Sequence, residues 1–337
     1  MIVVLKPSIT KEQLNHLIKS IEDLGFKTHY NKGQERSIVG IIGDERNLSK
    51  NKLEAFEGVE KVLTVLKPYK LASREFHPQD TVIEVDGVKL GGKEVIALAG
   101  PCSVESEEQL MTIAESVKKS GAKILRGSVY KPRTSPYDFQ GLGDEGLKLL
   151  AKAKEETGLV VETEVMDPRK VEIVAEHVDI LRVGARNFQN YDLLKELGKI
   201  NKPVILKRGI SGYINEWLLA AEYIMNEGNQ QVILCERGIR TFEIETRNTL
   251  DLNAVPFIKG TSHLPVIVDP SHGTGKRELV IPMSKAAIAA GADGLIVEVH
   301  NKPEEALSDG KQSLTLNLFE QLMNECRPVA KAINRKM

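Results

Sequence analysis

Eight apolar runs between residues 95 and 300 decide the fold of this 337-residue chain. They are VIALAGPC (95–102), AKILRGSV (122–129), LVVETEV (159–165), DILRVGA (179–185), PVILKRG (203–209), QVILCERG (231–238), LPVIVDPSH (264–272) and GLIVEVH (294–300). Successive runs start 20 to 37 residues apart, a spacing that accommodates a strand, a helix and two loops. Runs rich in Val, Ile and Leu are typical of parallel strands buried on both faces. Eight such units predict a closed (β/α)8 barrel.

Each run ends at or near a residue suited to chemistry. These residues are Cys102, Arg126, Glu164, Arg186, Lys207, Arg237, His272 and Glu298. Active sites of (β/α)8 barrels lie at the C-terminal ends of the strands. We therefore expect these side chains to surround a single site.

Composition excludes several classes of function. The 46 basic and 47 acidic residues give a net charge of −1, which provides no global attraction for nucleic acid or an anionic membrane. Three cysteines are too few for a secreted disulfide framework. The opening MIVVL is too short for a signal peptide, and no run approaches the roughly 20 apolar residues of a membrane span. We expect a cytoplasmic protein.

The first 68 residues have a different pattern. Strands are predicted over 1–7, 26–31, 37–43 and 59–68, and amphipathic helices over 10–24 and 48–58. Thr10 and Gln13 have the spacing of a capping box, and Gly25 suits a helix end. The resulting β-α-β-β-α-β order is that of a ferredoxin-like domain. This segment carries no Cys/His cluster or Gly-rich phosphate loop.

Residues 69–94 are predicted to link the two domains. The segment 81–93, TVIEVDGVKLGGK, has the pattern of a hairpin with a turn at Asp86-Gly87. A hairpin directly before the first barrel strand would cover the barrel's N-terminal end. The barrel itself is predicted to occupy residues 95–337, behind a small domain over residues 1–68.

Four residues form a candidate metal site: Cys102, His272, Glu298 and Asp309. The first three stand at strand ends, and Asp309 lies in the loop after the last strand. A thiolate, an imidazole and two carboxylates suit one divalent transition ion of the Mn, Fe, Co or Zn class better than Mg or Ca. Taken singly, each residue has an ordinary alternative: a packed cysteine, a loop-capping histidine or an ion-paired glutamate.

A ring of cations follows the barrel strands. Its members are Arg126, Lys131, Arg133, Arg186, Lys207 and Arg237. Arg binds phosphate and carboxylate through paired donors, and Lys acts as a point charge. Six cations would serve two phosphate groups and a carboxylate. The alternative is salt bridges to nearby glutamates such as Glu162, Glu164 and Glu236.

At these residues the chain resembles the 3-deoxy-D-arabino-heptulosonate 7-phosphate (DAHP) synthases. The resemblance rests on AGPCS (99–103), LRGSVYKPRTSPYDFQGLG (125–143), VGARN (183–187), LKRG (206–209), CERGIRTFE (235–243), VDPSHGTG (268–275) and VEVHNKPEEALSDGKQSL (297–314). It covers nearly all of residues 70–337. The N-terminal domain resembles the regulatory extension of one branch of the type I-beta enzymes.

The resemblance implies a reaction and assigns residues to it. The family condenses phosphoenolpyruvate with erythrose 4-phosphate and releases phosphate, as the first step of the shikimate pathway to the aromatic amino acids. It implies metal binding by Cys102, His272, Glu298 and Asp309. It implies phosphoenolpyruvate binding by Arg126, Lys131, Gly184, Ala185, Arg186, Lys207 and Arg237. It implies erythrose 4-phosphate binding by Lys131, Pro132, Arg133, Thr134 and Ser135. We expect direct catalytic roles for Lys131, Cys102 and His272.

Regulation and assembly are further expectations. The extra domain suggests feedback inhibition by an aromatic amino acid, and family resemblance suggests a homotetramer. The nearest alternative is 3-deoxy-D-manno-octulosonate 8-phosphate synthase, although Pro132 and Thr134 favour the four-carbon sugar. A metal-dependent phosphohydrolase and a non-catalytic effector-binding protein remain as alternatives of other classes.

Overall fold

A computed structural model of the chain describes residues 1–33, 36–43, 48–63 and 68–337. These residues form two compact units, Met1–Gln79 and Asp80–Met337. In the part of the chain so described, no helix is long and apolar enough to cross a membrane.

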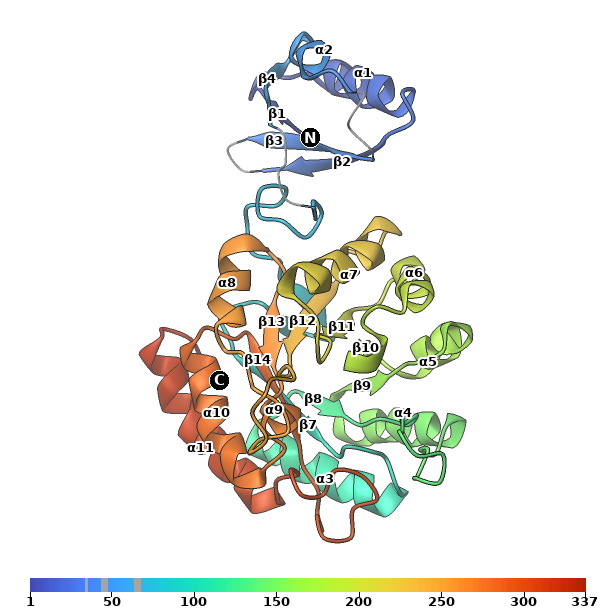
Figure 1. Cartoon of the computed structure of the whole chain (residues 1–337), viewed down its shortest axis with the longest axis vertical. Coiled ribbons are helices and arrows are strands. Elements are labelled where there is room, and N and C mark those ends of the chain that lie inside the picture. Colours follow the sequence, from blue (N-terminus) through green and yellow to red (C-terminus); the bar gives the residue numbers. More distant parts are fainter. Residues whose placement is uncertain (34–35, 44–47, 64–67) are drawn as a thin grey trace. The chain divides into compact units, whose positions relative to one another are not determined.

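The second unit is a closed barrel of eight parallel strands, as the apolar runs predicted. The strands are β7 (Ile96–Gly100), β8 (Ile124–Arg126), β9 (Val160–Glu164), β10 (Ile180–Val183), β11 (Val204–Lys207), β12 (Val232–Glu236), β13 (Val266–Val268) and β14 (Gly294–Glu298). Each strand pairs with the next, and β14 closes the barrel on β7. Figure 1 shows the strands at the centre of the unit, surrounded by helices.

The helices around the barrel follow the strands in turn. They are α3 (Glu107–Ser120), α4 (Asp144–Thr157), α5 (Val171–His177), α6 (Tyr191–Lys199), α7 (Ile214–Asn226), α8 (Ala254–Thr261), α10 (Arg277–Ala289) and α11 (Leu316–Ala332). One short addition, α9 (Pro270–Thr274), follows β13 directly. Local sequence explains their limits: α3 begins where the Ser106 side chain accepts from the amide of Gln109, and ends at Gly121, whose φ is +109°.

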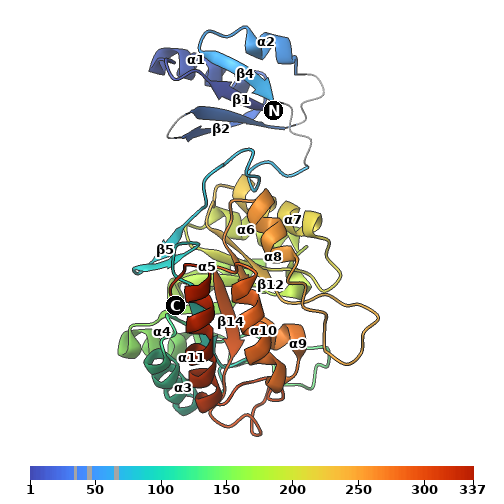
Figure 2. The ribbon, with the colours of Figure 1, turned by 90° about the vertical axis from the view of Figure 1, so that its left-hand side faces the viewer.

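The barrel interior is apolar at its N-terminal end. Ile96, Ile124 and Ile180 belong to one buried cluster that also contains Ile83 and Leu90 of the preceding hairpin. That hairpin consists of β5 (Ile83–Val85) and β6 (Val88–Leu90), with its turn at residues 86–87, as the sequence predicted (Figure 2). The hairpin therefore shields from water the end of the barrel that carries no chemistry.

The first unit is a four-stranded antiparallel sheet with two helices, the ferredoxin-like arrangement that was predicted. Its elements are β1 (Ile2–Leu5), α1 (Lys11–Glu22), β2 (Lys27–Lys32), β3 (Ser37–Ile42), α2 (Lys50–Glu54) and β4 (Val59–Leu63). The strand order is β2-β3-β1-β4. Thr10 and Gln13 form the predicted capping box. Residues 64–67 of the predicted fourth strand lie outside the described residues.

The first unit also includes residues 69–79, part of the segment predicted as a linker. Within it, Phe76 is buried against Gly40 of β3 and lies 5.1 Å from the ring of His29. A Cβ on Gly40 would come within 1.6 Å of the Phe76 ring, so only glycine leaves room for it. Asn31 donates to the backbone oxygen of Phe76. This stretch packs on its own sheet and is not free chain.

Candidate active site

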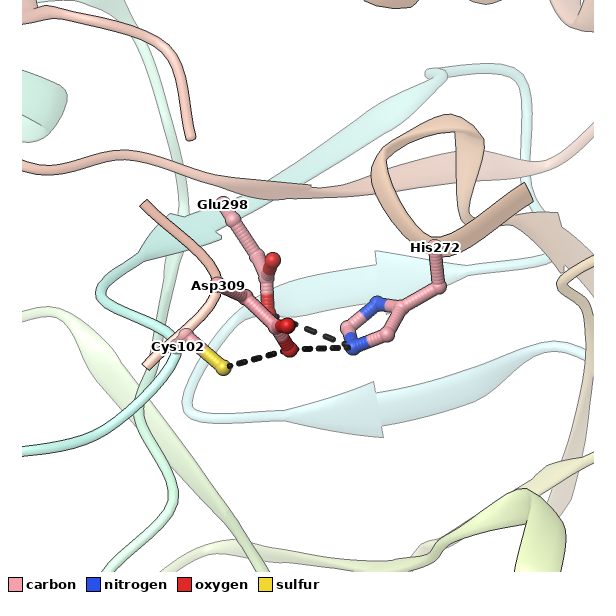
Figure 3. Close-up of side chains that lie close together, drawn as sticks. All are labelled: Cys102, His272, Glu298 and Asp309. Atoms are coloured by element: carbon pink, nitrogen blue, oxygen red, sulfur yellow. Dashed lines mark hydrogen bonds and ion pairs between the residues drawn. The ribbon is translucent and has the colours of Figure 1, made fainter. Parts of the chain in front are cut away.

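The structure brings the four predicted metal ligands together at the C-terminal ends of β7, β13 and β14 (Figure 3). One candidate ligand atom from each of Cys102, His272, Glu298 and Asp309 lies within 4.8 Å of all the others. Cys102 Sγ is 3.3 Å from Asp309 Oδ2, and His272 Nε2 is 3.3 Å from Glu298 Oε1. This combination of sulfur, nitrogen and oxygen atoms suits a divalent transition ion.

The electrostatics of the cluster keep its carboxylate charged and its thiol neutral. Burial raises the pKa of Cys102 to about 12, and the nearby charge of Glu298 adds to the effect. Burial alone would also raise the pKa of Glu298, but the interaction with His272 and the charge of Arg126 outweigh it and hold that pKa well below its ordinary range. Burial lowers the pKa of His272. A metal ion would therefore find a neutral imidazole ready to bind and a thiol that must lose a proton.

Lys131 contacts the cluster directly. It follows β8, and its side chain is buried. Its Nζ donates to Cys102 Sγ at 3.0 Å and to the backbone oxygen of Cys102 at 3.3 Å. The predicted catalytic lysine thus stands between the metal cluster and the neighbouring cavity.

A cavity of about 190 Å³ opens beside the cluster. Its lining residues are Lys131, Pro132, Arg133, Thr134, Asp138, Glu164, Arg182, Gly184, Ala185, Arg186, Lys207, Arg237, Arg247, His272 and Asp309. Seven of these are cationic and three are carboxylates, so the cavity has an excess of positive charge. Such a cavity favours an anionic ligand.

Two of the cavity's arginines are unpaired. Among the described residues, neither Arg186 nor Arg237 has a carboxylate within ion-pair distance, and Arg237 donates only to the backbone oxygen of Gly238. Burial lowers the pKa of Arg237. By contrast, Arg182 is fully engaged with Glu162, Glu164 and Ser128. Arg237 is only 5% exposed, and a buried cation without an anionic partner is costly, so a bound phosphate or carboxylate would relieve that cost.

Two predicted substrate contacts lie outside this lining. Arg126 is 1% exposed and lies beneath the cluster, where its Nη1 donates to Glu298 Oε1 at 2.9 Å. Its Nε and Nη2 have no hydrogen-bond partner. Ser135 instead accepts from the amide of Tyr137 and stabilises the turn after Thr134. Arg126 lies at a strand end, as predicted, but the sequence could not show that its side chain is buried beneath the metal cluster.

Gly184 and Ala185, expected to offer backbone contacts, do line the cavity. A Cβ on Gly184 would come within 2.1 Å of Glu164 Oε1. The glycine therefore allows the Glu164 carboxylate to lie directly against the backbone after β10. Close approach of this kind is one of the roles that only glycine fills.

Several residues of the site were missed by sequence reasoning. Arg247 lines the cavity and donates to Asp309 Oδ1 at 3.2 Å and to Gln312. Ser308 accepts from Arg133 Nη1 at 2.7 Å and lies 3.3 Å from Cys102 Sγ. Asp269 binds the ring of His272. Only Asp269 carried a signal, because it precedes His272 by three residues as the capping residue of α9.

Comparison with known proteins identifies the family. The model of the DAHP synthetase I family matches residues 78–334, and that of the DAHP synthase ferredoxin-like domain matches residues 1–67. A phospho-2-dehydro-3-deoxyheptonate aldolase of Thermotoga maritima is 55% identical over 337 residues, covering 100% of both chains. The chain belongs to the DAHP synthetase I family. It is thus an enzyme of the DAHP synthase type, and both parts of the chain have counterparts in that family.

Solved structures agree with this assignment. The crystal structure of the Thermotoga maritima DAHP synthase matches with a TM-score of 0.80 over 99% of this chain and 98% of that one. A truncated form of the same synthase matches with a TM-score of 0.74 over 79% of this chain and 98% of that one, at 53% identity. A 2-dehydro-3-deoxyphosphooctonate aldolase of Geobacter sulfurreducens is 33% identical, over 73% of this chain and 97% of its own length. This octulosonate enzyme is more distant from the chain than the Thermotoga maritima aldolase.

Proposed function

We propose that the barrel performs the DAHP synthase reaction at the cavity beside Cys102, joining phosphoenolpyruvate to erythrose 4-phosphate and releasing phosphate. This is the first step of the shikimate pathway. The observation that carries the proposal is a cavity with seven cations next to a cluster of thiol, imidazole and two carboxylates, in a chain of this family. Both substrates are phosphate esters, and phosphoenolpyruvate adds a carboxylate. A cytoplasmic location suits such a biosynthetic enzyme.

The cations divide naturally between the two substrates. Arg186 and Arg237 follow β10 and β12, and Lys207 is the last residue of β11. We assign all three to phosphoenolpyruvate, together with the backbone of Gly184 and Ala185. Lys131 lies between the two substrates. Residues 132–135, with Arg133 foremost, are assigned to the aldose phosphate. The absence of carboxylate partners for Arg186 and Arg237 supports the first assignment, because these cations are free to bind an anion.

The four clustered residues would hold one divalent transition ion. When bound, such an ion supplies Lewis-acid polarisation of an aldehyde oxygen. Lys131 Nζ then stands beside the alkoxide oxygen that forms when C3 of phosphoenolpyruvate attacks the aldehyde carbon, and donates a proton there. Water adds to C2, and the resulting hemiketal phosphate loses inorganic phosphate by cleavage of the C2–O bond. Arg186, Lys207 and Arg237 hold the enol phosphate in reach of that carbon and balance the charge that develops.

A parallel assay tests the reaction. Phosphoenolpyruvate consumption is measured with erythrose 4-phosphate and with arabinose 5-phosphate, each in the presence of Mn(II) and of EDTA. We expect metal-dependent consumption with the four-carbon sugar alone. Consumption with arabinose 5-phosphate would move the activity to the octulosonate class. Phosphate release without any sugar would identify a phosphohydrolase.

The division of cations is tested by Arg133→Ala. The KM for erythrose 4-phosphate should rise by at least about tenfold, and the KM for phosphoenolpyruvate should change little, because one charge-assisted phosphate contact is lost. Arg169→Ala is the matched control, since Arg169 is exposed and, among the residues that the structure describes, its side chain pairs with Asp167 alone. Equal increases in both KM values would show that the division is wrong.

We further propose that the first unit regulates the barrel and that an aromatic amino acid is its effector. Family resemblance also suggests a homotetramer. The solved truncated relative supports the design of the test, because a shortened chain that covers 79% of this one keeps the fold. Deleting the whole first unit, residues 1–79, should preserve turnover and abolish inhibition by tyrosine or phenylalanine. Inhibition that persists would relocate the effector site to the barrel.

A further inference from the structure

Asp269 connects the metal cluster to the cavity through a single carboxylate. It follows β13, caps α9 and is 1% exposed. Oδ1 accepts from the backbone amide of His272 at 2.9 Å. Oδ2 accepts from two donors, His272 Nδ1 at 2.7 Å and Lys207 Nζ at 2.5 Å. One oxygen atom thus joins a candidate metal ligand to a cation that lines the cavity.

We propose that Asp269 is a positioning residue that couples metal binding at the cluster to phosphoenolpyruvate binding in the cavity. The inference deepens the proposed function and rests on it. With Nδ1–H directed at Asp269, the lone pair of Nε2 faces Glu298 and Asp309. Figure 3 shows the His272 ring with Nε2 turned toward these two carboxylates. Asp269 therefore selects the tautomer that can bind a metal.

The direction of the coupling follows from the shared oxygen. A metal on Nε2 withdraws charge from the imidazole, so Nδ1–H becomes a stronger donor to Asp269 Oδ2. That oxygen then neutralises Lys207 less completely, and more of the ammonium charge is available to an anion in the cavity. Metal should therefore strengthen phosphoenolpyruvate binding. By thermodynamic reciprocity, phosphoenolpyruvate should strengthen metal binding by the same factor.

The alternative is that Asp269 acts on each ligand independently. Loss of its charge would then change both affinities, yet the ratio of phosphoenolpyruvate Kd values without and with metal would stay the same. Direct attraction between metal and anion also contributes to that ratio, but it does not require Asp269. The change in the ratio on substitution is therefore the quantity that a purely structural role would not alter.

The test is isothermal titration calorimetry with phosphoenolpyruvate, with and without Mn(II), and with no sugar phosphate so that no turnover occurs. In the wild type we expect the Kd ratio to be about tenfold. In Asp269→Asn it should fall to less than about threefold. Asp293→Asn is the control, because it removes a buried carboxylate from the opposite end of the barrel and should leave the ratio at the wild-type value.

A second variant protects the test against misfolding of the first. Lys207→Met removes the other end of the connection. It should weaken phosphoenolpyruvate binding and also reduce the ratio to less than about threefold. An unchanged ratio in a folded Asp269→Asn or Lys207→Met protein would overturn the coupling. Failure of wild-type protein to bind phosphoenolpyruvate at all would instead count against the proposed function.

Discussion

Two buried aspartates at opposite ends of neighbouring strands make an instructive pair. Asp269 follows β13, and Asp293 immediately precedes β14. Each is 1% exposed, and each lies within ion-pair distance of two basic side chains. Asp269 has Lys207 and His272 as partners. Asp293 has Lys259 and Arg335. The chemistry of the two clusters is similar, but their surroundings differ.

At Asp293 every partner is used for structure. Asp293 also accepts from the amide of Val266, while Arg335 donates to the backbone oxygens of Gly92 and Ala292. These bonds join the last residues of the chain to the base of the barrel. At Asp269 the partners face the cavity and the metal cluster, among arginines that lack carboxylate partners. A buried ion pair serves binding only where its cations have donors left for a ligand.

The largest effect should come from the candidate metal cluster, which Asp269 contacts through His272. Cys102→Ala removes the sulfur atom of the candidate metal cluster, so Mn(II) affinity and turnover should both fall on the order of 10³-fold. Titration calorimetry and steady-state assays measure the two losses. Cys235→Ala is the control, since Cys235 lies buried in β12 outside the cluster. Full activity in Cys102→Ala would show that the cysteine is not a metal ligand. It would also weaken the distinction between the functional end of the barrel and the structural end at Asp293.

Removing the charge of Asp293, at the N-terminal end of the barrel, should lower stability and leave catalysis unchanged. Asp293→Asn removes the buried charge that Lys259 and Arg335 contact, which should cost about 3 kcal/mol of unfolding free energy. Urea unfolding followed by the fluorescence of Trp217, the only tryptophan and a buried barrel residue, reports this loss. The kcat/KM of the folded variant should stay within about twofold of wild type. A large loss of activity at unchanged stability would show that Asp293, like Asp269, serves function and not structure.

Metal binding at Cys102 should release the proton of its thiol. The pKa of Cys102 is about 12 in the metal-free site, so the thiol is protonated at neutral pH and must release its proton when metal binds. Because the folded state holds this proton beyond the pH at which an exposed thiol loses it, metal affinity should increase as pH rises. We expect about a tenfold increase per pH unit near neutrality. Calorimetry in two buffers of different ionisation enthalpy should find about one proton released, and zero would contradict this assignment.

The smallest effect is expected from removing Lys259, the more exposed of the two basic partners of Asp293. The Lys259 side chain is 27% exposed, and Arg335 still neutralises Asp293 in its absence. Lys259→Met should therefore cost only about 1 kcal/mol of unfolding free energy and leave metal binding intact. The same urea experiment measures it. A cost as large as that of Asp293→Asn would show that the lysine, and not the arginine, holds the base of the barrel together.

Sequence reasoning reached the barrel and its ligand cluster for a definite reason. Parallel strands buried on both faces must be apolar throughout, and their carboxyl ends must meet at one rim. Cys102, His272 and Glu298 could therefore be grouped although almost 200 residues separate the first from the last. The same reasoning could not tell how deep a strand-end residue lies. Arg126 ends β8 and Arg186 closely follows β10, yet Arg126 is buried beneath the cluster and Arg186 lines the cavity.

The sequence by itself determined the (β/α)8 barrel, the ferredoxin-like unit and the candidate metal ligands, because hydrophobic periodicity and strand ends are local properties. Only the tertiary structure decided which cations have partners and which do not. It also placed Ser308 beside Arg133, Arg247 beside Asp309, and Asp269 between Lys207 and His272. These contacts join loops and strand ends that are far apart in the chain, and their geometry depends on how the whole barrel closes.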